Sequence, residues 1–166
     1  MKFILDRIKM LWIGFWLVAA SLLLFIPITA AAFFSRTGNL AFTISKGWAW
    51  LILLVTGVRP EIRGKEHIRK GQSYIIISNH QSHFDILALV TQLGIQFRWI
   101  IKKELRKVPL FGYALYASRN IYIDRSDREK AIESIRQGVE RLPAGTSVMF
   151  FAEGTRSPDG RIGTFK

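Results

Sequence analysis

Residues 74–90 read YIIISNHQSHFDILALV and join three kinds of local sequence. Residues 74–78 are mostly β-branched or aromatic, which predicts a short buried strand. A polar turn follows, and the next apolar side chains fit one face of a helix (Ile86, Leu87, Leu89 and Val90). A strand that leads through a polar loop into a helix is the repeating unit of α/β proteins.

The same alternation continues toward the carboxyl end of the chain. Further strands are predicted at residues 98–101, 120–123 and 147–151. A helix is predicted between the last two of these strands, because Ser126 and Glu129 fit a capping box and apolar residues recur at helical spacing up to Pro143. We therefore predict an α/β fold with a mostly parallel sheet flanked by helices.

The amino-terminal third has a different composition. Residues 10–34 carry no charge, and as a helix of 25 residues they would rise about 37 Å, enough to cross a hydrocarbon core of about 30 Å. Pro27 predicts a kink or break near Ile26. A second apolar stretch, residues 47–58, has 12 residues and is too short to span. We expect a membrane-associating helical pair that dips into one leaflet, or one span followed by an interfacial helix.

A cleaved secretory signal is the alternative for this region, because basic residues precede the apolar run and three alanines follow it. The uncharged run exceeds the usual signal length of about 7–15 residues, and a second apolar segment follows, so a retained membrane segment is favoured. Charged residues become frequent from residue 59 onward. We predict two units: a two-helix membrane segment at residues 1–58 and an α/β domain at residues 59–166, truncated at its carboxyl end.

The composition of the 166 residues excludes several classes of protein. The absence of cysteine excludes a disulfide scaffold, a zinc ribbon and a cysteine acyl-enzyme. A hydrophobic content of 49% excludes a disordered chain. The 24 basic and 12 acidic residues give a net charge of +12, which attracts nucleic acid, phosphorylated small molecules or acidic lipid headgroups.

Four polar clusters follow the four predicted strands. They are Asn79-His80 with Asp85, Lys102-Lys103-Glu104, Asp124-Arg125, and Glu153-Gly154-Thr155-Arg156. Open α/β sheets bind ligands at the carboxyl edge of their strands, so we expect these clusters to converge on one site.

The first cluster allows three interpretations. If His80 lies in the loop and Asp85 in the first turn of the helix, the carboxylate can orient the imidazole as a general base. Ser82 and Asp85 also fit a capping box, so that Asp85 would only cap the helix. Alternatively, His80, His83 and Asp85 would be metal ligands.

The basic residues of the other clusters suit a phosphate group. Arg156 can hold a phosphate through two hydrogen bonds, and Lys102 can add a positive charge. The alternative for Arg156 is a solvated residue paired with Glu153. For Asp124 and Arg125, an internal salt bridge is favoured over contact with a ligand.

Several blocks of this sequence resemble those of a known family. NHQSHFD matches the NHxxxxD block of the glycerolipid acyltransferases, and FAEGTR matches their FPEGTR block with alanine at the proline position. RNIYIDR resembles their GxxFIDR block, with Arg119 in place of glycine and Tyr122 in place of phenylalanine. KKELRKVPLFG resembles the connecting segment. Residues 59–166 are therefore similar to the 1-acyl-sn-glycerol-3-phosphate acyltransferases.

The resemblance implies a role for each matching residue. His80 would be the general base, and Asp85 would orient it. The acceptor would bind to the loop of Glu153, Gly154, Thr155 and Arg156, with Arg156 on its phosphate. Lys102 and Arg125 would assist at the phosphate.

The resemblance also implies a reaction and its partners. A fatty acyl group would pass from acyl-CoA or acyl carrier protein to lysophosphatidic acid, without a covalent acyl-enzyme, a bound cofactor or a metal. The protein would contact an anionic bilayer and no nucleic acid, at a bacterial inner membrane with its catalytic part on the cytoplasmic face. The family's fourth block is missing after residue 166, so we expect the chain to be a fragment.

Three other functions stay open. Related acyltransferases with the NHxxxxD block acylate other lysophospholipids or amino-lipids. A membrane-bound hydrolase would use the imidazoles and the carboxylate as metal ligands. An anchored module without enzymatic activity would need only the basic charge to bind anionic lipid or nucleic acid.

Overall fold

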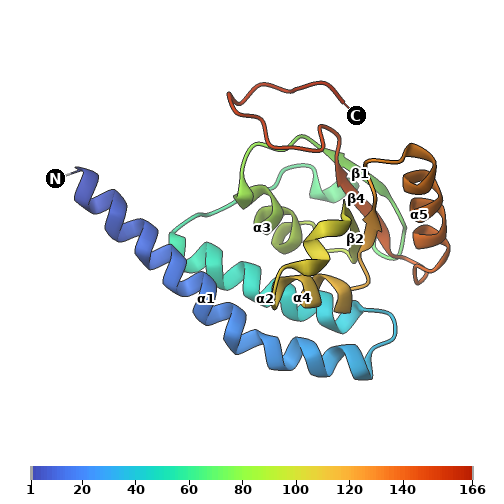
Figure 1. The fold of residues 1–166 in the computed structure, drawn as a ribbon, viewed down its shortest axis with the longest axis horizontal. Helices are drawn as coiled ribbons and strands as arrows, with labels where there is room; N and C mark the ends of the chain where they lie inside the picture. The colour runs from blue at the N-terminus through green and yellow to red at the C-terminus, as the bar shows by residue number, and fades with distance from the viewer. Residues whose placement is uncertain (1, 166) are drawn as a thin grey trace.

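A helical hairpin and a four-stranded parallel sheet make up the fold (Figure 1). The computed structural model describes residues 2–165. The hairpin consists of α1 (Lys2–Phe34) and α2 (Asn39–Thr56). The sheet contains, in spatial order, β1 (Ile75–Ser78), β4 (Ser147–Phe151), β2 (Phe97–Lys102) and β3 (Ile121–Ile123). Each neighbouring pair of strands is parallel, as the alternating sequence predicts.

Helices flank this sheet, which confirms the predicted fold class. They are α3 (His83–Gln92), α4 (Phe111–Ala117) and α5 (Arg128–Glu140), with single 3₁₀ turns η1 (Lys65–His67) and η2 (Lys103–Lys107). Figure 1 shows α5 on the other side of the sheet from α3 and the hairpin. The capping box predicted at Ser126 is wrong. The side chain of Asp127 instead accepts the N–H of Lys130 at 3.0 Å, and the Ser126 hydroxyl donates to Asp124.

The two hairpin helices differ from their predicted lengths. Helix α1 continues through Pro27, so the predicted break is wrong. Leu24 and Ile28, on either side of the proline, belong to one apolar cluster with α2 and α4, and this packing holds both segments in line. Helix α2 begins at Asn39 rather than near residue 47, because buried Ala41 and other apolar residues extend its packed face.

The hairpin indicates association with a membrane. Both helices are long and apolar enough to span one, so the prediction that the second is too short is wrong. Most of the large apolar side chains along α1 are exposed to solvent, which in water is an unfavourable arrangement. Burial of this face in lipid would remove that cost.

A single apolar core joins the hairpin to the sheet. One cluster contains Phe42 and Ile52 of α2 together with Leu87 of α3 and Phe97 and Trp99 of β2. The hairpin therefore packs on the sheet as part of the fold.

Arg98 fastens the hairpin turn to the sheet. This residue of β2 is fully buried, and its guanidinium donates to the carbonyl of Thr37 at 3.0 Å and to the side-chain oxygen of Asn39. It also donates to the carbonyl of Phe97 at 2.8 Å. Burial lowers the pKa of Arg98 to about 10, so the group stays charged at neutral pH.

Candidate active site

The four polar clusters lie along the carboxyl edge of the sheet. His80 follows β1, the loop of Glu153 to Arg156 follows β4, Lys102 ends β2 and Arg125 follows β3. Since β1 and β4 are neighbours, His80 and the β4 loop lie side by side. The N–H of Ser157 donates to the carbonyl of His80 at 2.7 Å, which ties the two loops together.

The imidazole of His80 is held on two sides. Its Nδ1 lies 3.0 Å from Oδ2 of Asp85, and the side chain is only 12% exposed. The ring stacks on Phe151, with centroids 3.8 Å apart and planes 6° apart. Among the described residues, no hydrogen bond engages Nε2. This nitrogen is therefore the one that can exchange a proton with a substrate.

Asp85 performs two of the predicted roles at once. Besides the contact with His80, Oδ2 accepts the N–H groups of Gln81 at 2.7 Å and Ser82 at 2.8 Å, and Ser82 completes the capping box. Burial alone would raise the pKa of Asp85, but hydrogen bonds from Ser82, His80 and Gln81 lower it below the ordinary value. The carboxylate is therefore charged at neutral pH.

The arrangement gives no support to a three-ligand metal site. Within residues 2–165, no three histidine, aspartate or glutamate side chains group in a way that could hold a metal ion. Burial and the positive charge of Arg156 lower the pKa of His83, which is therefore neutral at physiological pH.

Contacts with neighbouring strands shape the loop after β4. Glu153 is buried, and its carboxylate accepts the backbone N–H of His80 at 3.4 Å. Gly154 has a φ of 68°, in the region that favours glycine, and its carbonyl accepts a hydrogen bond from Arg125 at 2.5 Å. Glu153 and Arg125 thus hold the loop in place from both sides.

Two cations at this edge remain available to an anion. The exposed Arg156 makes no hydrogen bond or ion pair with any other described residue, so the alternative pairing with Glu153 is not observed. Thr155, next to it, is also exposed. Lys102 is half exposed, and its Nζ is 3.9 Å from the carboxylate of Glu104, a loose pair that solvent screens.

The predicted salt bridge between Asp124 and Arg125 is wrong. Asp124 pairs with Lys103 and accepts two hydrogen bonds from Ser126. These partners hold the pKa of Asp124 well below its usual range. Arg125 is left with the carbonyl of Gly154 as its partner and with further donors free to face a ligand.

An apolar cavity of about 90 Å³ lies between the hairpin and the sheet. Its walls include Phe25 and Trp48 of the hairpin, Leu87 of α3 and Trp99 of β2. Trp99 stacks on Phe151 at a centroid distance of 5.3 Å, and Phe151 stacks on His80. A row of aromatic rings therefore connects the imidazole to the cavity. Sequence reasoning missed this cavity, because its lining comes from four helices and a strand far apart in the chain.

Comparison with known proteins gives one consistent result. A family model described as Acyltransferase matches residues 59–166. The 1-acyl-sn-glycerol-3-phosphate acyltransferase of Pseudomonas aeruginosa is 39% identical over 117 residues, covering 70% of this chain and 45% of that protein. The chloroplastic enzyme of the same name from Arabidopsis thaliana is 36% identical over 124 residues, covering 74% of this chain and 34% of that protein.

Two further matches extend this result. A lyso-ornithine lipid O-acyltransferase of Brucella abortus is 34% identical over 116 residues, covering 70% of this chain and 42% of that protein. The crystal structure of the 1-acyl-sn-glycerophosphate acyltransferase of Thermotoga maritima superposes with a TM-score of 0.81 at 23% identity, covering all of this chain and 68% of the other. The chain thus spans less than half the length of these three curated relatives.

Proposed function

The chain belongs to the acyltransferase family, and on this premise we propose that it transfers a fatty acyl group from an acyl thioester to the free hydroxyl of a lysophospholipid. The proposed acceptor is 1-acyl-glycerol-3-phosphate and the proposed product is phosphatidic acid, in line with the names of the relatives. One observation carries the proposal: the imidazole of His80, paired with Asp85, lies beside a loop whose Arg156 is free to bind a phosphate.

His80 acts as the general base in this proposal. Its Nε2 removes the proton from the acceptor hydroxyl while that oxygen attacks the thioester carbonyl. The tetrahedral intermediate collapses as the carbon–sulfur bond breaks, and the imidazolium returns the proton to the leaving thiolate. Asp85 keeps the proton of the neutral ring on Nδ1 and stabilises the imidazolium. General-base assistance of this kind contributes about 10²–10⁴-fold.

The acceptor phosphate is bound by the basic residues of the edge. Arg156 has two parallel N–H groups for the phosphate oxygens, and Lys102 and the free donors of Arg125 add positive charge. Glu153, Gly154 and Thr155 shape the loop that presents Arg156. Fixing the phosphate fixes the distance from the hydroxyl to His80, and such positioning lowers the entropic part of the barrier.

The apolar cavity supports a role for the hairpin in binding hydrocarbon. It starts at the aromatic row beside His80 and is lined by the hairpin itself. The segment of an acyl chain that entered this cavity from the bilayer would stay out of water. We propose that residues 1–58 insert into the membrane and help to hold the acyl chain, while residues 59–166 supply the catalytic groups.

The proposal extends to the donor and to the location. The donor is acyl-CoA or acyl carrier protein, and no cofactor or metal takes part. The location is a bacterial inner membrane, with the catalytic edge on the cytoplasmic face. The net charge of +12 supports contact with an anionic bilayer surface.

A transfer assay tests this function. The full-length protein in lipid vesicles is given an acyl thioester and, in parallel, lysophosphatidic acid, a zwitterionic lysophospholipid and lyso-ornithine lipid. We expect conversion of lysophosphatidic acid, loss of turnover in His80→Ala and weaker acceptor use in Arg156→Ala. Arg128→Ala, an exposed arginine at the start of α5, controls for lost charge and should match the parent. Unchanged turnover in His80→Ala would remove the mechanism, and preferred conversion of lyso-ornithine lipid would replace the acceptor.

A further inference from the structure

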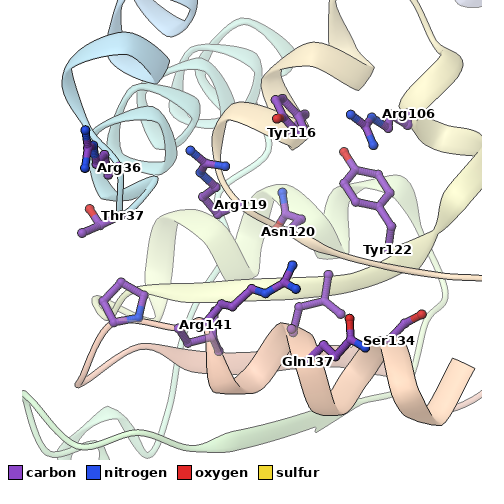
Figure 2. A pocket seen from close by; sticks show the side chains of 14 residues that line it. Arg36, Thr37, Arg106, Tyr116, Arg119, Asn120, Tyr122, Ser134, Gln137 and Arg141 are labelled. Carbon is purple, nitrogen blue, oxygen red and sulfur yellow. The ribbon is translucent and has the colours of Figure 1, made fainter.

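A second, larger cavity lies away from the candidate active site. It has a volume of about 560 Å³ and is bounded by the hairpin turn, the end of α4, the start of β3 and the second half of α5. None of its lining residues belongs to the proposed catalytic or acceptor-binding set. Figure 2 shows how the side chains of these separate elements surround the cavity.

Four arginines line this cavity, and no acidic residue does. They are Arg36 of the hairpin turn, Arg106 of η2, Arg119 after α4 and Arg141 after α5. All four are exposed, and within residues 2–165 none of them makes an ion pair or a side-chain hydrogen bond. In Figure 2, the guanidinium of Arg141 lies below Asn120, and that of Arg119 points upward, away from Arg141. Because like charges repel, four unpaired arginines around one cavity are more favourable with an anion bound there.

The backbone of Arg119 has an unfavourable conformation. Its φ is 58°, in the left-handed region, which is unfavourable for any residue that has a Cβ. The family block that residues 119–125 resemble has glycine here, and glycine would remove the strain. A guanidinium at this point instead reaches the cavity between the hairpin turn and α5. Backbone strain is often found at residues that bind ligands, so the strain at Arg119, which lines the cavity, indicates a binding role.

The rest of the lining suits the oxygens of a phosphate. Arg106 and Arg119 lie over the ring of Tyr116, at 4.5 Å and 5.8 Å from its centroid, and the ring limits where the two guanidinium groups can go. Burial raises the pKa of Tyr122 to about 12, so its hydroxyl is neutral, and it donates to the carbonyl of Gly112 at 3.4 Å. Gln137 of α5 donates one amide N–H to Glu133 at 2.6 Å and has a second N–H for a ligand.

The cavity also lies beside the end of α1, which we propose to insert into the membrane. Phe33 and Phe34, at the end of α1, are 77% and 86% exposed, and Arg36 lies two residues after Phe34. Aromatic tips beside an arginine are typical of the boundary between hydrocarbon and headgroups. We propose that this cavity binds the phosphate of an anionic phospholipid headgroup, at a site separate from that of the acyl acceptor.

Equilibrium binding to detergent-solubilised full-length protein tests the site without use of its activity. The probes are dihexanoyl phosphatidylglycerol, dihexanoyl phosphatidylcholine, inorganic phosphate and adenosine 3′,5′-bisphosphate. We expect phosphatidylglycerol to bind most tightly, and Arg119→Gly or Arg141→Gln to weaken that binding by about tenfold each. Arg69→Gln and Arg128→Gln remove the same charge from exposed positions outside the cavity and should leave it unchanged.

Stability separates a lost ligand contact from a damaged fold. Because Arg119→Gly removes the left-handed strain, its thermal midpoint should equal or exceed that of the parent while its affinity falls. Equal affinity in the parent, the cavity variants and the control variants would overturn the proposal. Tighter, cavity-dependent binding of adenosine bisphosphate than of phosphatidylglycerol would overturn the lipid as the source of the phosphate. His80→Ala should bind phosphatidylglycerol like the parent, so a failure of the proposed reaction leaves this result intact.

Discussion

Asp85 both caps α3 and holds His80, and two substitutions can separate these roles. Its Oδ2 accepts hydrogen bonds from the imidazole and from two backbone N–H groups. Asp85→Asn keeps the shape of the side chain and removes its charge. Ser82→Ala removes the other half of the capping box and leaves the contact with His80 in place. We expect Asp85→Asn to lower both acyl transfer and stability, and Ser82→Ala to lower stability alone.

The size of the effect on transfer follows from the contact with His80. A hydrogen bond to a charged group contributes about 1.5–3 kcal/mol. Because each 1.36 kcal/mol changes a rate tenfold, Asp85→Asn should lower kcat by about 10–150-fold if the full contribution acts in the transition state. Loss of an N-cap lowers the free energy of unfolding by about 0.5–2 kcal/mol. We expect a decrease of this size in both Asp85→Asn and Ser82→Ala.

The measurement combines kcat at saturating acceptor with the free energy of unfolding of each variant in the same detergent. The reasoning is refuted if Ser82→Ala and Asp85→Asn lower kcat equally at equal stability, because the carboxylate would then act only through the helix. It is also refuted if Asp85→Asn keeps the kcat of the parent.

The remaining predictions concern stability. Arg98→Leu removes the buried donor that binds the carbonyl of Thr37 and the side chain of Asn39 at the hairpin turn, and should lower the free energy of unfolding by about 1.5–3 kcal/mol in denaturant titrations; a loss below about 1 kcal/mol would contradict the anchoring role. Gly38→Ala forces a Cβ to within 2.9 Å of backbone atoms of Ser118 at a φ of 74°, whereas Gly57→Ala has a φ of 72° and open space, so Gly38→Ala should lower the thermal midpoint more; equal midpoints would show no steric effect. The lowered pKa of Asp85 stabilises the fold above the ordinary carboxyl range, so stability should fall as the pH drops below about 4, and fall less steeply in Asp85→Asn.

The strands and their polar ends were predictable because their signals are local. Residues 147–151 form β4 with the predicted bounds, and β3 differs by a single residue at its start. Once the strands are parallel, their carboxyl ends must share one edge, so the side chains that follow them must lie near one another. The contact between His80 and Asp85 required only one more step, a helix that starts between them.

The hairpin was harder to predict, because packing overrides local preference there. Pro27 removes one backbone hydrogen bond, but the apolar contacts on both sides of it keep α1 continuous. The buried position of Arg98 was also unpredictable, because its partners are distant in the sequence. Its acceptors at the hairpin turn lie 59 and 61 positions earlier in the chain, and no local pattern predicts a buried arginine in a strand.

The shared core would give the hairpin a part in the proposed reaction as well as in the proposed membrane attachment. Trp99 lies in the core cluster with Ala49 and Ile52 of α2, and it also lines the apolar cavity and continues the aromatic row to His80. A change in the packing of α2 would therefore shift Trp99, which is part of the cavity wall. Because Trp99 stacks on Phe151 and Phe151 stacks on His80, such a shift would also change the position of the imidazole. The two proposed units, residues 1–58 and 59–166, would then differ in role but share one packed core. Removal of the hairpin would expose the sheet face on which the proposed acyl site depends.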